Sequence, residues 1–151
     1  MSTHTASRTI IATPRAVFRA LIDPESMTCW RAPAGMTLRV LAFDPRPGGR
    51  YRMELHYDPA RAALGKTTPS SDIVTGTFIE LVAEDRIVED VDFESADPAF
   101  AGTMRLTTSM TPVADGTKVT IVADNVPSGI SETDNREGMN ATLKQLANFL
   151  E

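Results

Sequence analysis

The chain has 151 residues, which is the size of one domain with a core large enough to enclose a cavity. Its net charge of -5 and its isoelectric point near 5.0 argue against a nucleic-acid surface, which needs basic residues to displace counterions. The single cysteine, Cys29, excludes an internal disulfide and is typical of a reducing compartment. No secretory signal and no apolar run of the ~20 residues that span a bilayer are found, so we expect a cytoplasmic protein without membrane insertion.

The first third of the sequence predicts a strand and two short helices. Residues 5–12 partly alternate between apolar and polar side chains, as a strand does. Thr13 and Asp23 each stand directly before a proline, and this pair of residues is typical of an N-cap followed by the first helical residue. The second helix should end near Trp30.

From residue 36 the apolar residues recur at every second position, which predicts strands at 36–43, 50–57, 73–82, 86–93, 102–111 and 117–125. The stretch Ala114-Asp115-Gly116-Thr117 is a strong hairpin signal. Links this short require antiparallel neighbours.

The pair Gly48-Gly49, flanked by Arg46 and Arg50, raises the question of a phosphate-binding loop. Such a loop needs backbone N–H groups at the start of a helix, but the residues that follow read as a strand. We therefore expect the glycines to turn a hairpin, with the arginines pairing with carboxylates such as Asp44.

The chain closes with a predicted helix that begins at Ser131 as N-cap. Its apolar residues form one stripe toward the sheet: Met139, Leu143, Leu146 and Leu150. Gly138 costs ~1 kcal/mol relative to alanine inside a helix. Either a neighbour packs unusually close to it, or the cost is tolerated.

Five successive segments carry a resemblance to a known family: TPRAVFRALIDPESMTCWRAP, FDPRPGGRYRM, GTFIELVAEDRIV, PVADGTKVTI and REGMNATLKQLANFLE. Together they resemble the motifs of the family named after the activator of the heat-shock protein ninety ATPase, in the START-like (SRPBCC, polyketide cyclase/dehydrase and lipid transport) superfamily. The resemblance covers residues 10–151. It implies an α+β helix-grip fold in a single domain (residues 1–151), with a curved antiparallel sheet wrapped around a long C-terminal helix, two short helices after the first strand, and a cavity.

The sequence departs from the family pattern at two places. Gly138-Met139 replaces the Gly-Trp pair of many members, which predicts a softer and more adaptable wall. Glu89 replaces an aromatic or aliphatic residue. By alternation it shares a face with Ile87, Val91 and Phe93, so a carboxylate points either into the cavity or, after a bulge or register slip, into solvent. We favour the exposed position, because the neighbouring residues are also acidic, as is most of the segment 84–97.

Catalytic and metal chemistry have few candidates. A Cys29-His56 dyad is conceivable, but we expect Cys29 to be a buried structural thiol and His4 to lie in a frayed terminus. His56 with Asp58 supplies too few ligands for a metal. We therefore expect no catalytic residue, no metal and no cofactor.

The resemblance places a ligand pocket between the sheet and the last helix, and each residue assigned to it is also explicable as ordinary core. The apolar candidates are Trp30, Tyr51, Met53, Leu55, Phe78, Phe93, Met104, Leu106, Met139 and Leu143. The candidate polar anchors are Glu89, Thr108 and Asn140. Residues 58–72 are either a lid with a short helix or an ordinary long connection.

Three functions remain open at this stage. The first is binding of a small hydrophobic or amphipathic ligand, which we favour. The second is the chaperone-activating role that the family name suggests, and the third is a cyclase or dehydratase reaction with Glu89 or His56 as acid or base. The sequence decides neither the ligand nor whether the protein is a monomer or a homodimer.

Overall fold

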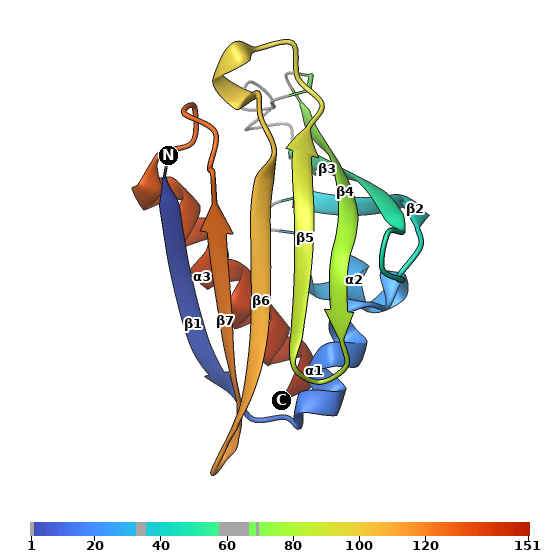
Figure 1. Cartoon of the computed structure of the whole chain (residues 1–151), viewed down its shortest axis with the longest axis vertical. Helices are drawn as coiled ribbons and strands as arrows, with labels where there is room; N and C mark the ends of the chain where they lie inside the picture. Colours follow the sequence, from blue (N-terminus) through green and yellow to red (C-terminus); the bar gives the residue numbers. More distant parts are fainter. Residues whose placement is uncertain (1, 33–35, 58–66, 69) are drawn as a thin grey trace.

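A computed structural model describes residues 2–32, 36–57, 67, 68 and 70–151. Seven antiparallel strands form one sheet in the order β1-β7-β6-β5-β4-β3-β2 (Figure 1). The strands are β1 (Thr3–Ile10), β2 (Met36–Phe43), β3 (Arg50–Tyr57), β4 (Ser71–Val82), β5 (Arg86–Phe93), β6 (Met104–Val113) and β7 (Gly116–Asp124).

The helices are α1 (Pro14–Leu21), α2 (Pro24–Trp30), the short 3-10 helix η2 (Pro98–Phe100) and α3 (Glu132–Leu150). Each α-helix begins where a side-chain oxygen accepts a hydrogen bond from the backbone. Thr13 accepts from Ala16, Asp23 from Ser26, and Ser131 from Asp134, at 3.1, 3.3 and 3.1 Å. The predicted helix starts are therefore confirmed, because these caps satisfy N–H groups that the first turn leaves free.

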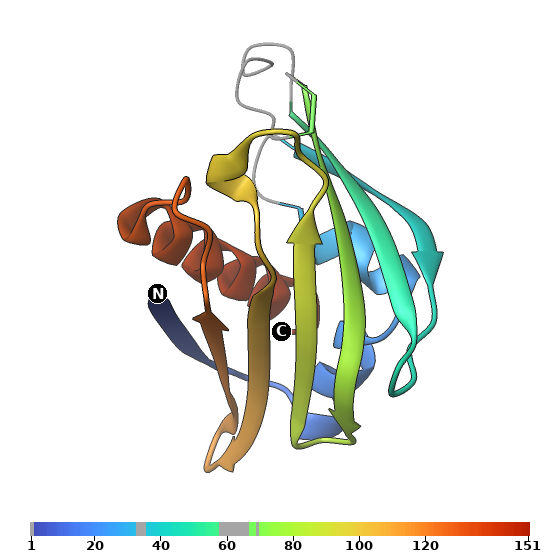
Figure 2. The same cartoon turned by 45° about the horizontal axis from the view of Figure 1, so that its top comes forward.

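The topology explains the concave shape. β1 pairs with β7, so the first and last strands lie side by side. The chain then passes from this edge to β2 at the opposite edge through α1 and α2, which lie with α3 on the same side of the sheet (Figure 2). β-Bulges in β2 and β4 interrupt the pairing around Leu41 and Ile79, and bulges increase the bend of a strand. The predicted α+β helix-grip fold is confirmed.

The loop between β2 and β3 is a hairpin turn, as predicted. Gly48 has a φ of +83°, which favours glycine, and a Cβ on Gly49 would lie 2.1 Å from the carbonyl oxygen of Asp44. The N–H of Gly48 donates to the carbonyl of Phe78 at 2.7 Å, so it serves the sheet and not an anion. Arg46 pairs with Asp44 at 2.8 Å.

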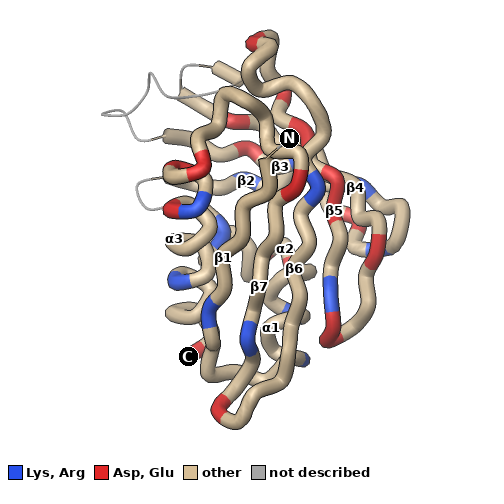
Figure 3. Tube along the Cα trace, turned by 60° about the vertical axis from the view of Figure 1, so that its left-hand side comes forward, with Lys and Arg blue, Asp and Glu red and all other residues tan. Residues whose placement is uncertain are grey.

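The outer face of the sheet carries acidic residues of the segment 84–97 that pair with arginines. Asp90 accepts two hydrogen bonds from Arg105, and Glu94 accepts two from Arg52. Acidic and basic residues are interspersed over the side of the molecule that Figure 3 presents. In the part of the chain that is described, no helix has the length and apolar character needed to cross a membrane.

Candidate functional site

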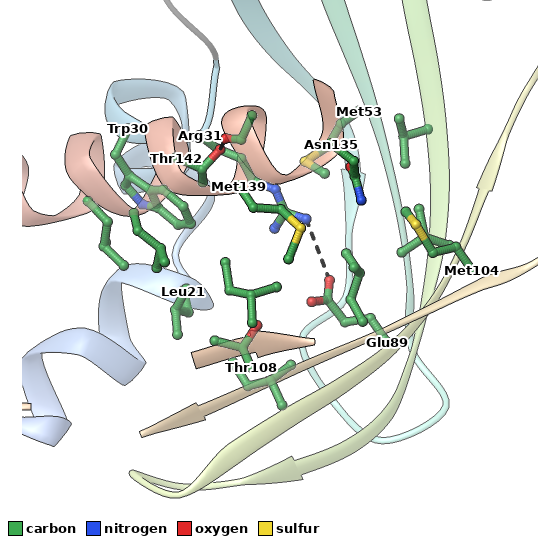
Figure 4. A pocket seen from close by; sticks show the side chains of 18 of the residues that line it. Leu21, Trp30, Arg31, Met53, Glu89, Met104, Thr108, Asn135, Met139 and Thr142 are labelled. Atoms are coloured by element: carbon green, nitrogen blue, oxygen red, sulfur yellow. Dashed lines mark hydrogen bonds and ion pairs between the residues drawn. The ribbon is translucent and has the colours of Figure 1, made fainter. Parts of the chain in front are cut away.

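A cavity of about 250 Å³ lies between the concave face of the sheet, the end of α2 and the inner face of α3 (Figure 4). Most of the residues assigned to the pocket from the sequence line it: Trp30, Met53, Leu55, Glu89, Phe93, Met104, Leu106, Thr108, Met139 and Leu143. They come together because every second residue of β3, β5 and β6 points to the same face, while the stripe on α3 points back at them.

Tyr51 and Phe78 do not line the cavity, which corrects the prediction for both residues. They are almost fully buried beside it, in an aromatic cluster with Phe43 whose ring centroids are 5.2 to 6.2 Å apart. Edge-to-face and tilted ring pairs of this kind fill a core tightly. Their contribution to the site is therefore indirect.

Asn140 was also misassigned, since it is exposed on the outer side of α3. One residue along a helix rotates the side chain by about 100°, which turns Asn140 away from the buried Met139. The polar residues that α3 does bring to the cavity are Asn135 and Thr142, one turn before and after Met139 (Figure 4). Sequence reasoning missed them, although their spacing of three to four residues from Met139 is a usable signal.

Glu89 is buried, with 5% of its surface exposed, so the favoured exposed position was wrong. The interruption of pairing falls in β4 around Ile79, and β5 itself keeps Glu89 on the inner face between Ile87 and Val91. The carboxylate is not alone. The hydroxyl of Tyr51 donates a hydrogen bond to Glu89 Oε1 at 2.6 Å, and a guanidinium nitrogen of Arg31 lies 3.7 Å from the same oxygen.

Arg31 is the residue of the site that sequence reasoning missed. It caps the C-terminus of α2, and its guanidinium lies over the ring of Tyr51 at 5.8 Å from the centroid. Burial lowers the pKa of Arg31, but Glu89 and the Tyr51 oxygen together outweigh this effect, so the pKa of Arg31 is raised overall. The arginine is therefore a cation at every working pH. A buried carboxylate needs a partner, but no local pattern in the sequence identifies Arg31 as that partner.

Burial and the charge of Glu89 raise the pKa of Tyr51 well above its usual value. The phenol therefore stays protonated and acts as a hydrogen-bond donor. Its position depends on Gly76, the residue opposite Tyr51 on β4, because a Cβ on Gly76 would lie 2.0 Å from a ring atom of Tyr51. The missing side chain of Gly76 lets the ring lie across the strand, with its hydroxyl at Glu89.

The other chemical candidates, Cys29 and His56, have different partners. Cys29 is exposed, and its thiol contacts the carbonyl of Glu25 at 3.7 Å, so the expected buried thiol is corrected. α2 turns this side chain outward while Trp30 points in. His56 lies on β3 and pairs with Glu54 at 2.8 Å. Among the described residues, no group of three metal-ligating side chains occurs.

His4 is buried in β1, not frayed, because β1 pairs along its full length with β7. Its Nδ1 lies 2.8 Å from Nδ2 of Asn135, which fixes one wall residue of the cavity. Residues 58–72, for which a lid and an ordinary long connection were both open, fall mostly outside the described residues. The last two of them, Ser71 and Asp72, are the buried start of β4.

A curved antiparallel sheet that grips a long C-terminal helix, with an internal cavity, defines the START-like helix-grip class. Residues 11–151 match the family model described as "Activator of Hsp90 ATPase homolog 1-like protein", and the chain belongs to this family. No curated protein matches the chain.

Solved structures agree with this assignment. A protein from Chromobacterium violaceum is 30% identical, with a TM-score of 0.89 over 99% of this chain and 96% of that one. A protein from Rhodobacter sphaeroides is 20% identical, with a TM-score of 0.81 over 99% and 91%. An AHSA1-like protein from Aeromonas hydrophila is 17% identical, with a TM-score of 0.75 over 98% and 91%, and these last two likenesses concern the fold. Family and fold fit a ligand-binding or activator-type domain.

Proposed function

We propose that the protein binds a small hydrophobic or amphipathic molecule in the cavity between the sheet and α3. The observation that carries this proposal is the cavity itself, about 250 Å³ of space with a mostly apolar wall and a few polar groups. Ligand sites typically have this composition. An apolar cavity of about 150 Å³ already accepts benzene, so the space here suits a larger molecule.

The methionines of the wall support the same function. Met53, Met104 and Met139 come from three different elements and all reach the cavity (Figure 4). Methionine side chains are flexible and polarisable, and they adapt to the shape of an apolar partner. A wall of this kind accommodates ligands without a movement of the backbone.

The two alternatives have less support. The activator role draws on the family name, and a shared fold does not establish a shared function. A cyclase or dehydratase would need a group that exchanges protons near neutral pH. Of the two acid-base candidates, His56 is not among the residues that line the cavity, and Glu89 is engaged by Tyr51 and Arg31. This arrangement suits binding better than proton transfer.

The first test is native mass spectrometry of the purified protein, compared with its denatured mass, followed by extraction and identification of any bound compound. A discrete apolar or amphipathic compound supports the proposal. A clean apo mass, together with no thermal shift from a panel of hydrophobic compounds, contradicts it and favours a protein partner.

A variant tests the place of binding. Met139→Trp introduces the bulkier residue that many family members carry, so we expect it to fill part of the cavity and weaken ligand binding by about tenfold with little loss of stability. The exposed neighbour supplies the control, since Asn140→Gln should leave affinity unchanged. Equal affinity of Met139→Trp and the parent protein would exclude this cavity as the site.

A further inference from the structure

The cavity wall holds a widely spaced ion pair between Arg31 and Glu89. The side chains of Arg31 and Glu89 are only 20% and 7% exposed, yet their closest approach is 3.7 Å, which is too long for a hydrogen bond. Glu89 Oε1 accepts its short hydrogen bond from Tyr51, whereas Arg31 interacts with the same oxygen at the longer distance and lies over the ring of Tyr51. A guanidinium and a carboxylate that are held apart in this way offer hydrogen-bonding capacity to a ligand.

The charges of this pair balance. Within the described lining of the cavity, Arg31 and Glu89 are the only charged side chains, one of each sign. The O–H of Tyr51 and the guanidinium of Arg31 both stabilise the negative charge of Glu89. This pair thus offers both a donor and an acceptor of hydrogen bonds, and its net charge is zero.

We propose that the ligand is electrically neutral and carries a hydroxyl or primary amide group that accepts a hydrogen bond from Arg31 and donates one to Glu89, while its apolar body lies against the methionine-lined wall. This inference rests on the proposed binding function and names the chemical class of the ligand.

Anionic, cationic and purely apolar ligands fit this ion pair less well than a neutral polar one. An anionic ligand would gain from Arg31 but would bring a second negative charge close to Glu89 in a site with little water, and like charges at short range cost binding energy. A cationic ligand meets the same obstacle at Arg31. A pure hydrocarbon displaces water from Arg31 and Glu89 but makes no hydrogen bond to either side chain. The lost hydrogen bonds with water lower its affinity.

The experiment is isothermal titration calorimetry of the full chain at pH 7.5 with four matched probes: 4-propylphenol, propylbenzene, 4-propylbenzoate and 4-propylbenzylammonium. We expect the neutral phenol to bind at least about tenfold tighter than the hydrocarbon and either ion, since hydrogen bonds to charged groups discriminate at this level. If the benzoate or the hydrocarbon binds as tightly as the phenol, the inference is wrong while the binding function stands. If no probe binds, both are wrong.

Two neighbouring substitutions sharpen the result. Glu89→Gln keeps an acceptor for Tyr51 but leaves Arg31 without a counter-charge, so the benzoate should gain about tenfold relative to the phenol. Asp90→Asn removes the same charge one residue away on the outer face of β5 and should leave the ratio unchanged. A change of ratio in both variants, or in neither, contradicts the role of the ion pair. An acid recovered by extraction from the native protein would contradict it independently.

Discussion

Each face of β5 carries a carboxylate that pairs with an arginine, but the two pairs differ in geometry and burial. On the outer face, Asp90 accepts hydrogen bonds from Arg105 at 2.8 and 3.0 Å, and this pairing lowers the pKa of Asp90. On the inner face, Glu89 meets Arg31 at 3.7 Å without a hydrogen bond. The solvated pair is complete in itself, whereas the buried pair keeps capacity for a further partner. Burial of an ion pair seldom adds stability, so the inner pair is better explained by recognition than by folding.

The largest predicted effect breaks the inner pair. Glu89→Ala leaves Arg31 as a nearly buried cation without a partner, and it should lower the free energy of unfolding by about 3 kcal/mol in urea titrations. The double variant Arg31→Met/Glu89→Leu replaces both charges by apolar groups and should recover most of this loss. If the double variant is as unstable as Glu89→Ala, the pair serves stability after all.

The second prediction concerns the support of the inner pair. Gly76→Ala forces a methyl group into the ring of Tyr51 and should lower the free energy of unfolding by about 2 kcal/mol. In a Tyr51→Leu background the same substitution should cost markedly less, because the ring that it displaces is gone. Equal costs in the two backgrounds would show that Gly76 matters for another reason.

Gly138 provides the opposite case on α3. It lies at the cavity, and a Cβ there would meet nothing within 4 Å. Gly138→Ala should therefore raise the free energy of unfolding by about 1 kcal/mol, which is the difference in helix propensity. The melting temperature is a sufficient measurement, and a decrease would mean that the open space at this glycine is needed by the fold.

The smallest effect tests the outer pair. Asp90→Asn should lower the free energy of unfolding by about 0.5 kcal/mol at pH 7, as expected for a surface pair. The folded-state pKa of Asp90 lies below the usual 3.8, so its contribution is present above that pH and is lost as the pH falls through the folded-state pKa. Parent and variant should therefore converge once the pH falls below the folded-state pKa of Asp90, and also in high salt. A difference that persists under both conditions would have a non-electrostatic origin.

Local signals in the sequence were sufficient to predict the helices and strands and which face of each is buried. The N-caps Thr13, Asp23 and Ser131 and the alternation of the strands depend on residues close in sequence, and the structure has them where they were predicted, within two residues at strand ends. Family resemblance supplied the curvature and the cavity, which no local pattern contains.

The failures share a physical origin in distant contacts. Whether Glu89 is buried depends on Arg31 and Tyr51, which lie far from it in sequence, and neither strand alternation nor composition reports such a partner. Cys29 sits on a helix of seven residues, too short for a stripe to define its face. Asn140 is exposed to solvent although Met139, the residue before it on α3, lies at the cavity wall.

The position of Trp30 makes ligand binding observable by intrinsic fluorescence. It is the only tryptophan of the chain, it is 3% exposed at the cavity wall, and its indole N–H is held by the carbonyl of Ala20 at 3.1 Å. The indole of Trp30 is therefore a single fluorophore that lies at the cavity wall in a fixed orientation. Its emission wavelength depends on the polarity of the cavity. Binding and release of a ligand can therefore be followed in real time in the unmodified protein, without an added label.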